Sequence, residues 1–244
     1  MTTEKYVFIL GAGASVDSGL KTYRGENGVY TNSENPDSAS LAGFSYENPE
    51  NTLCPEVLYG DPKGPEKIWS FLKPLYSQIR QNTPGPFYAL LKHIFEKFPE
   101  SFIITQNVDS YAKTVTKNLV EIHGSNEQMK CMKCGLIQQT DLDKPKCMCG
   151  FPCRPNIVLF GENLDRDKLE IIYRNIKHNV KNVIVIGTSL QFPYLREIIK
   201  KCRGAKVVHI NPDTEYWKNV RKNEIWLKLS AYEGLNAFFK EKLL

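Results

Sequence analysis

The sequence lacks a long hydrophobic run and any block of charge of one sign. The apolar run nearest its start, Val7–Leu10, follows Glu4 and Lys5 and is too short for a signal peptide or a membrane span. Lysine and arginine are scattered, so the net charge of +5 forms no basic stripe of the kind that duplex-binding proteins carry. We therefore expect no membrane partner, and direct binding to nucleic acid is disfavoured.

The cysteines do not have the pattern of a disulfide framework. Their number is seven, which is odd, and five of them lie between positions 131 and 153. In a chain without an export signal, such a cluster is more typical of metal ligation than of disulfide bonds. The pattern predicts a reducing compartment, the cytoplasm or the nucleus.

What the sequence does contain is a series of short apolar runs that each stop in small polar residues. The runs are Tyr6–Leu10, Phe102–Thr105, Val183–Ile186, Val207–Ile210 and Ile225–Leu229. Strands of a parallel sheet that are buried on both faces have this composition, and ligands bind at their carboxyl ends. Apolar residues at helical spacing lie between or after the runs, at Leu169, Ile172 and Ile176 and at Leu235, Phe238 and Phe239. The pattern predicts an α/β fold, a Rossmann-like parallel sheet with helices on both faces.

The first run leads into Gly11-Ala12-Gly13, and we expect a helix from Val16. Glycines at such a turn let the backbone approach a pyrophosphate at a helix N-terminus, although a tight turn alone also explains them. A dehydrogenase would need a third glycine where Val16 stands, and an acidic residue after a second strand; Glu34 lies near that distance but in a loop rich in Asn and Pro. No Gly-Lys-Ser/Thr occurs, which excludes a P-loop.

Longer motifs resemble those of the sirtuin family. The first is Gly11-Ala12-Gly13-Ala14-Ser15-Val16-Asp17-Ser18-Gly19-Leu20-Lys21-Thr22-Tyr23-Arg24-Gly25, similar to G-A-G-x-S-x-x-S-G-I-P-x-F-R-G. Lys21 replaces the usual proline and Tyr23 the usual phenylalanine. Similar blocks follow in the family's order: Thr105-Gln106-Asn107-Val108-Asp109 (T-Q-N-I-D), His123-Gly124 (H-G) and Gly187-Thr188-Ser189-Leu190 (G-T-S-L). Together with the cysteines, these blocks are distributed along nearly the whole chain.

The resemblance implies an enzyme, an NAD-dependent protein-lysine deacetylase or deacylase that produces nicotinamide, O-acyl-ADP-ribose and free lysine. It implies an NAD-binding domain of residues 1–25, 86–125 and 156–244. Residues 26–85 would form a cofactor loop and the helical part of a small domain, and residues 126–155 its zinc-binding module. The cofactors would be NAD and zinc, and the partner an acyl-lysine protein or peptide.

The same resemblance assigns roles to individual residues. His123 would be the catalytic base, because a neutral imidazole accepts a proton near pH 7, and Asn107 a second catalytic residue. A lone histidine is more often structural, and Asn and Asp after a strand also close turns. The residues implied in cofactor binding are Gly11, Ala12, Gly13, Ser15, Gly19, Tyr23, Arg24, Gln106, Asn107, Asp109, Gly187, Thr188, Ser189, Asn211 and Ala231.

The metal ligands begin with a two-residue-spaced pair, Cys131 and Cys134, which suits two thiolates on one Zn²⁺. The second pair is irregular, because Cys147 and Cys149 are separated by one residue and Cys153 lies four further on. In the family the last ligand stands five residues before an Arg-Pro, which selects Cys149, with Cys147 as its partner. Cys153 is the reserve ligand or a free, buried thiol. Four thiolates without an open position imply a structural zinc.

Two further segments concern the substrate. Val158-Leu159-Phe160-Gly161-Glu162 resembles V-x-F-G-E, so Val158, Phe160, Gly161 and Glu162 are implied in binding the acyl-lysine peptide along an extended strand. An ordinary core strand is the alternative. Sirtuins that prefer acidic acyl groups share a Tyr-x-x-Arg pair after a Trp-x-Phe helix start; here Leu72 and Leu75 follow Trp69-Ser70-Phe71. This difference predicts a preference for neutral acyl groups.

The sequence alone leaves two alternatives to a deacylase. An NAD glycohydrolase or mono-ADP-ribosyltransferase would use the same scaffold. Lys21 and Tyr23 keep this alternative open, because they lie in the loop over the reactive ribose. The segment from Val158 to Glu162 speaks against it. A zinc-ribbon nucleic-acid binder would explain the cysteines and the charge, but not the polar residues that follow the strands.

Overall fold

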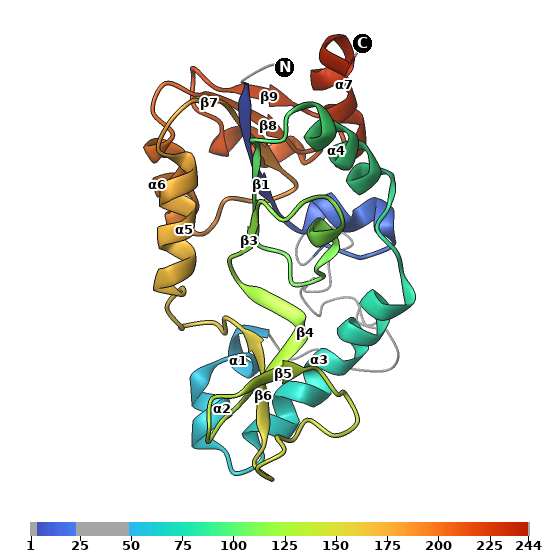
Figure 1. The fold of residues 1–244 in the computed structure, drawn as a ribbon, viewed down its shortest axis with the longest axis vertical. Coiled ribbons are helices and arrows are strands. Elements are labelled where there is room, and N and C mark those ends of the chain that lie inside the picture. Colours follow the sequence, from blue (N-terminus) through green and yellow to red (C-terminus); the bar gives the residue numbers. More distant parts are fainter. Residues whose placement is uncertain (1–3, 23–48, 244) are drawn as a thin grey trace.

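The computed structural model describes residues 4–22 and 49–243. The larger part of the molecule contains a six-stranded sheet. The smaller part lies at one end of the long axis (Figure 1). All pairings in the large sheet are parallel. In spatial order its strands are β3 (Leu119–Glu121), β2 (Phe102–Thr105), β1 (Lys5–Leu10), β7 (Val180–Ile186), β8 (Lys206–Ile210) and β9 (Ile225–Leu227). The strand order reverses between β1 and β7, which is where such sheets bind ligands.

The sheet is buried on both faces. In β1, Tyr6 and Phe8 pack in one hydrophobic cluster, whereas Val7 and Ile9 pack in the other, because successive side chains alternate across a strand. Helices α5 (Arg166–Ile176) and α6 (Pro193–Lys201) cover one face, and α4 (Pro86–Lys97) and α7 (Ala231–Leu243) the other (Figure 1). The predicted Rossmann-like sheet with helices on both faces is confirmed.

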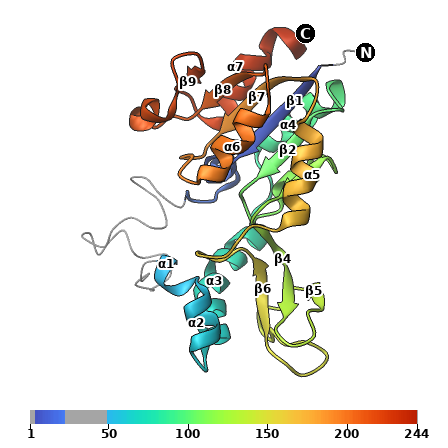
Figure 2. The same ribbon diagram turned by 90° about the vertical axis from the view of Figure 1, so that its left-hand side faces the viewer.

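The smaller part combines a second sheet with helices from an earlier segment (Figure 2). Its antiparallel strands, in spatial order, are β5 (Ile137–Gln139), β4 (Gly124–Cys131) and β6 (Cys153–Ile157). Its helices are α1 (Pro49–Thr52), α2 (Pro55–Gly60) and α3 (Gly64–Gln81). The Trp69 indole N–H donates to the Cys153 carbonyl over 2.7 Å, which ties α3 to β6. Because α3 begins at Gly64, Trp69 lies inside this helix and not at its start.

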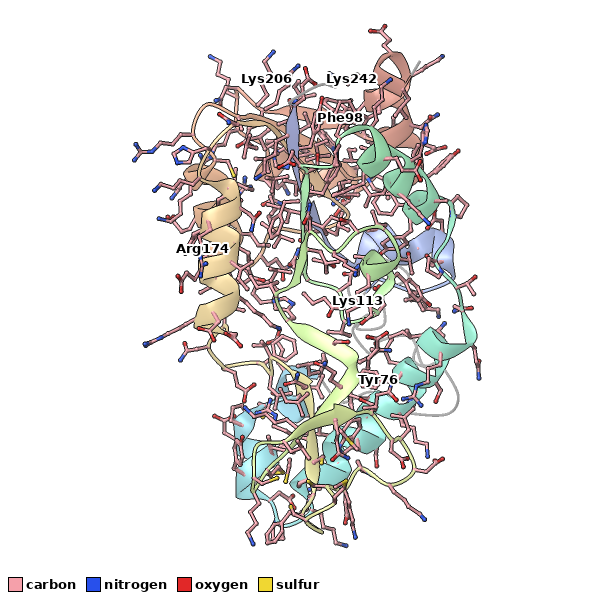
Figure 3. All side chains as sticks on the ribbon, in the orientation of Figure 1. Tyr76, Phe98, Lys113, Arg174, Lys206 and Lys242 are labelled. Atoms are coloured by element: carbon pink, nitrogen blue, oxygen red, sulfur yellow. The ribbon has the colours of Figure 1, made fainter. Side chains whose placement is uncertain are left out.

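Side chains sort by polarity in the expected way (Figure 3). Tyr76 and Phe98 are buried in the interior, whereas Arg174 and Lys206 project into solvent. Among the described residues, no helix combines the length and the hydrophobicity that a membrane span requires.

Some elements differ from the expectations. The segment after β1 is a short 3-10 helix, η1 (Ala12–Ser18), and begins four residues before the predicted start at Val16. Its hydrogen bonds span three residues, as from the Ala14 N–H to the Gly11 carbonyl, because the glycine turn is tight from its first residue. Strand β3 was not predicted. The other short elements are η2 (Tyr111–Thr114) and η3 (Thr214–Asn219).

Candidate active site

Two glycine turns meet at the carboxyl ends of β1 and β7. The Gly11 N–H donates to the Ile186 carbonyl and the Gly13 N–H to the Gly187 carbonyl, each over 2.9 Å. Gly187 has a φ of +60°, and a Cβ on Gly13 would lie 2.6 Å from its Cα. Side chains are therefore excluded from this contact, and Ala12, Gly13 and Gly187 leave partly exposed backbone at the point where the strand order reverses.

Gln106 and Asn107 follow β2 at the same edge of the sheet. The Gln106 amide donates to Thr188 Oγ1 over 2.9 Å, and the Asn107 amide donates to the Gly11 carbonyl over 3.0 Å. The Asn107 bond joins the ends of the neighbouring strands β2 and β1, and the Gln106 bond reaches past β1 to the end of β7. Asn107 Oδ1 is buried and has no hydrogen-bond donor among the residues that the structure describes. A buried acceptor of this kind fits a ligand that supplies an N–H or O–H.

Ser15 and Asp109 lie behind Asn107 in a buried network. Ser15 Oγ donates to Asp109 Oδ2 over 2.6 Å, and it is 2.7 Å from the Tyr88 hydroxyl and 3.2 Å from Asn107 Nδ2. Burial raises the pKa of the Asp109 carboxyl above its usual value. The network thus fixes the Asn107 side chain, and the binding role implied for Ser15 and Asp109 stays a prediction.

Most of the other residues implied in cofactor binding follow β7, β8 or β9. Thr188 is buried, Ser189 is exposed, and the Asn211 amide donates to the Thr188 carbonyl over 3.3 Å. Ala231 is partly buried and begins α7, and Gly19 ends η1 with a φ of +81°. The positions of Tyr23 and Arg24 fall outside the described residues.

His123 stands between β3 and β4, where the large and small parts join. Its Nδ1 is 3.0 Å from the Gln106 carbonyl, and its Nε2 is 2.6 Å from the Tyr194 hydroxyl. Burial lowers the pKa of His123 to about 4, and the charge of Lys168 acts in the same direction. The imidazole is therefore neutral at pH 7. Nothing in the sequence predicts the contact with Tyr194.

The residue after His123 must be glycine. Gly124 has a φ of +93°, and a Cβ there would lie 2.1 Å from the Asn156 carbonyl oxygen. This close approach places the His123 backbone beside β6, and the Val158 N–H donates to the His123 carbonyl over 2.8 Å. The glycine of the His-Gly pair is thus a requirement of local geometry.

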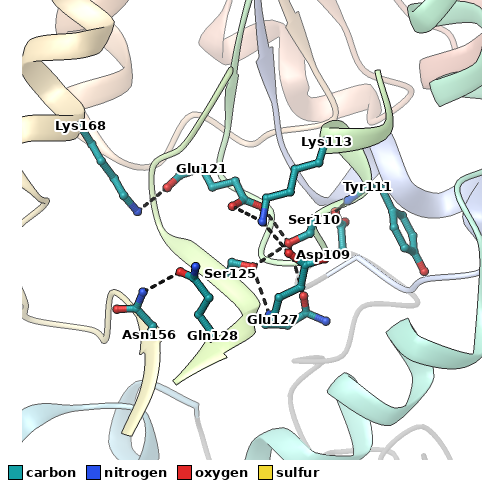
Figure 4. Close-up of polar contacts among 11 residues, drawn as sticks. Asp109, Ser110, Tyr111, Lys113, Glu121, Ser125, Glu127, Gln128, Asn156 and Lys168 are labelled. Atoms are coloured by element: carbon teal, nitrogen blue, oxygen red, sulfur yellow. Dashed lines mark hydrogen bonds and ion pairs between the residues drawn. The ribbon is translucent and has the colours of Figure 1, made fainter. Parts of the chain in front are cut away.

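A polar network supports the strand that leads to His123 (Figure 4). The Ser110 hydroxyl donates to Glu121 Oε1 over 2.7 Å and is 2.7 Å from the Ser125 hydroxyl. The Lys113 ammonium lies 3.1 Å from Glu121 Oε2, and the Lys168 ammonium donates to the Glu121 carbonyl over 2.7 Å. Residues on both sides of His123 are therefore held by β3, β4, η2 and α5.

A pocket of about 390 Å³ opens beside His123, and Val158 and Glu162 are among its lining residues. The expected extended strand at Val158–Phe160 is not formed, because β6 ends at Ile157. The Phe160 N–H instead donates to the Leu53 carbonyl over 2.8 Å. Glu162 accepts from Arg154 over 2.7 Å and from the Leu159 N–H over 2.9 Å. Phe160 is partly buried and Gly161 is exposed.

Four cysteine sulfurs lie together at the far end of the smaller part, which we call the small domain. The Sγ atoms of Cys131, Cys134, Cys147 and Cys149 all lie within 4.8 Å of one another. Three of the separations are 3.5, 3.7 and 3.8 Å. A tetrahedral zinc with bonds of about 2.3 Å requires sulfurs roughly 3.8 Å apart, so the group fits this metal. Cys153 lies outside the group; it is fully buried, and burial raises the pKa of its thiol to about 11.

Comparison with known proteins identifies the family to which this chain belongs. Residues 11–193 match the family model described as the Sir2 family, which is the sirtuin family. The chain belongs to the Sir2 family. This Sir2-family chain is 30% identical over 225 residues to the NAD-dependent protein deacylase 2 of Pseudomonas aeruginosa, covering 86% of this chain and 82% of that protein. It is 31% identical over 216 residues to the NAD-dependent protein deacylase of Aquifex aeolicus, covering 85% and 83%.

Solved Sir2 structures are similar along nearly the whole chain. A complex of a Sir2 homologue with NAD has a TM-score of 0.77 at 25% identity, covering 98% of this chain and 91% of that one. A Sir2 structure with a deacetylated p53 peptide and 3'-O-acetyl-ADP-ribose has the same TM-score and identity, covering 98% and 94%. The predicted family membership of this Sir2 chain is confirmed.

Proposed function

We propose that this protein is an NAD-dependent protein-lysine deacylase that releases nicotinamide, O-acyl-ADP-ribose and free lysine. The observation that carries the proposal is the neutral imidazole of His123, which lies between the polar strand ends around Asn107 and a pocket that includes Val158. The names of the relatives from Pseudomonas aeruginosa and Aquifex aeolicus support the same activity.

The strand ends have the chemistry that NAD requires. The partly exposed backbone at Gly13 and Gly187 can lie close to a pyrophosphate, since side chains are excluded there. Asn107 Oδ1 offers a buried acceptor to a carboxamide or a hydroxyl group. NAD would supply the ADP-ribosyl group that accepts the acyl chain when nicotinamide leaves. By the family resemblance, Asn211 would lie near the adenosine ribose and Ala231 near the adenine.

The protein's own part in the reaction is to place a base. His123 is neutral and can take a proton from a ribose hydroxyl at Nε2, because its Nδ1 already faces the Gln106 carbonyl. Asn107 is fixed beside this position by its bond to Gly11 and by Ser15. Fixed dipoles in a buried site stabilise developing charge more than water does.

The peptide would bind in the pocket beside His123. The N–H groups of Val158, Leu159 and Phe160 all bond within the chain, so pairing with a peptide backbone falls to carbonyl groups in this segment. The Arg154–Glu162 pair holds the turn in place. We propose that the acyl chain is neutral, since Leu72 and Leu75 belong to the apolar core.

The four clustered cysteines would hold one structural zinc. Four thiolates fill its coordination shell, so the metal would stabilise the small domain and take no part in the chemistry. All seven cysteines are free thiols, which fits the reducing environment of a cytoplasm or nucleus.

The decisive experiment is mass spectrometry of NAD incubated with the protein and acyl-lysine peptides of several chain lengths. We expect nicotinamide, O-acyl-ADP-ribose and free lysine in equal amounts. Consumption of NAD without peptide would indicate the glycohydrolase, and a mass increase of the peptide by ADP-ribose would indicate the transferase. Binding to DNA at physiological salt, with no turnover of NAD, would favour the zinc-ribbon alternative.

A further inference from the structure

The Nε2 atom of His123 has a hydrogen-bond partner within the protein. The Tyr194 hydroxyl lies 2.6 Å from it, although the two residues are 71 positions apart. Tyr194 is the second residue of α6, so a different element from the one that carries the base reaches the reactive nitrogen.

The direction of this hydrogen bond follows from the other ring nitrogen. The Gln106 carbonyl, 3.0 Å from Nδ1, can only accept, so Nδ1 carries the proton of the neutral ring. The lone pair is then on Nε2, and the Tyr194 hydroxyl must donate to it. Burial raises the pKa of Tyr194 well above its usual value, so the phenol retains its proton.

Aromatic packing holds Tyr194 in this position. The Phe192 ring stacks on the Tyr194 ring, with centroids 5.7 Å apart and an angle of 21° between the planes. Phe192 also meets the His123 ring at 75°, with centroids 5.5 Å apart. Helix α6 is anchored by Leu195 and Ile198, which are fully buried in the cluster on that face of the sheet.

We propose that Tyr194 is a positioning residue that caps Nε2 of His123, and that a ribose hydroxyl of NAD takes its place on this nitrogen when NAD binds. The replacement of Tyr194 by a ribose hydroxyl rests on the proposed function, whereas the hydrogen bond between Tyr194 and His123 does not. Because the lone pair accepts one donor at a time, the Tyr194 hydroxyl competes with the ribose. The cap therefore opposes the binding of NAD but leaves the rate after binding unchanged.

The cap also acts on the charge of His123. A donor on the lone pair stabilises the neutral ring, so the hydroxyl lowers the pKa of His123. The charged group that acts on the ring is Lys168 of α5. Lys168 is in turn affected by Asp165 and by Glu121 on β3, whose carboxylate pairs with Lys113. A substitution of Tyr194 by Phe removes the hydroxyl and leaves these charges in place.

The test compares Tyr194→Phe with a matched control. Tyr216→Phe also removes a tyrosine hydroxyl from a histidine, since the Tyr216 hydroxyl lies 3.1 Å from His209 Nδ1, outside the site. NMR titration of the His123 ring in the free protein should show a pKa raised by about half a unit to one unit in Tyr194→Phe only. Calorimetry should show NAD and ADP-ribose bound roughly 2- to 10-fold more tightly, with KM for NAD lowered and kcat unchanged.

Two results would overturn the proposal. An unchanged His123 titration and unchanged affinity for ADP-ribose in Tyr194→Phe would show that the cap does not exist in solution. A loss of kcat as large as that of His123→Ala would place the tyrosine in the proton path instead. If even the unsubstituted protein deacylates no peptide, the proposed function fails, and the titration of His123 still decides whether Tyr194 caps it.

Discussion

The His123 side chain is held by one hydrogen bond on each ring nitrogen, to Gln106 and to Tyr194. Replacement by alanine removes the base but none of the glycine turns or the Asn107 amide. We expect His123→Ala to lose roughly 10²- to 10⁴-fold in kcat and to bind NAD nearly as well as the unsubstituted protein. Single-turnover rates and calorimetry measure the two quantities.

The matched control is His93→Ala on α4, because His93 is exposed and its ring lies 3.2 Å from Glu96, away from the site. Its activity should stay within a factor of two. Deacylation by His123→Ala within a few-fold of the unsubstituted rate would mean that another group serves as the base.

The burial of His123 also sets the pH dependence of the reaction. A base acts in its deprotonated form, and the pKa of His123 is lowered from 6.5 to about 4. As pH falls, kcat/KM should therefore stay level through pH 6 and 5 and decline only near 4. Rates should be measured in the range where circular dichroism shows an unchanged fold. A decline centred near 6.5 would show that the ring is solvated in the free enzyme.

Some of these residues could be predicted from sequence, and others could not. His123, Gln106 and Asn107 stand in short motifs whose spacing is fixed by a strand end, so a local pattern is sufficient to find them. Tyr194 depends on how α6 packs against the sheet, which no local pattern encodes. The cofactor-binding role of Ser15 and Asp109 stays a prediction, whereas their contacts with each other and with Asn107 and Tyr88 could not be predicted from the sequence.

At the scale of elements, α3 sets the expected acyl preference. Leu72 is buried and Leu75 packs against the same cluster, so neither can bond an anion. Lys73 points to the surface, where it pairs with Asp143 at 2.9 Å. A buried carboxylate without a partner costs several kcal/mol. We therefore expect kcat/KM for succinyl-lysine to be roughly a hundredfold or more below that for acetyl-lysine.

One peptide carrying acetyl-, succinyl- or myristoyl-lysine in turn gives the comparison. Efficient removal of myristoyl would show that the leucines leave room for a long aliphatic chain. A clear preference for succinyl would contradict the prediction and point to a cation from elsewhere, such as Lys21.

The strands were more predictable than the other elements. Five apolar runs became β1, β2, β7, β8 and β9 within a few residues, because strands buried on both faces have a continuous apolar composition. β3 has three residues, of which only Val120 is buried, and so gives no such run. Val158–Phe160 has the composition of a strand, but its N–H groups bond to His123, Glu162 and Leu53 and the chain turns.

The described residues form a sheet that would hold NAD and a small domain that contributes residues to the pocket beside His123. They join at His123, since β4 begins at the next residue and the segment after β6 bonds to the His123 carbonyl. The cysteine group lies at the opposite end of β4 and β6. We therefore expect folding of the small domain to depend on the metal and to affect the position of His123 through these two strands.

This coupling gives the last prediction, the effect of losing one thiolate. Cys149→Ser should lose zinc and the ordered small domain, whereas Cys153→Ser should keep one zinc per chain, because Cys153 lies outside the sulfur group. The glycine turns on β1 and β7 do not touch the module. Cys149→Ser should therefore still bind ADP-ribose within a few-fold of the unsubstituted protein while its deacylation falls by at least tenfold. Zinc analysis, calorimetry and peptide turnover on the same preparations measure the three effects.

Normal zinc in Cys149→Ser with depleted zinc in Cys153→Ser would reverse the ligand assignment. Equal loss of ADP-ribose binding and deacylation would show that the two parts of the molecule fold as one unit.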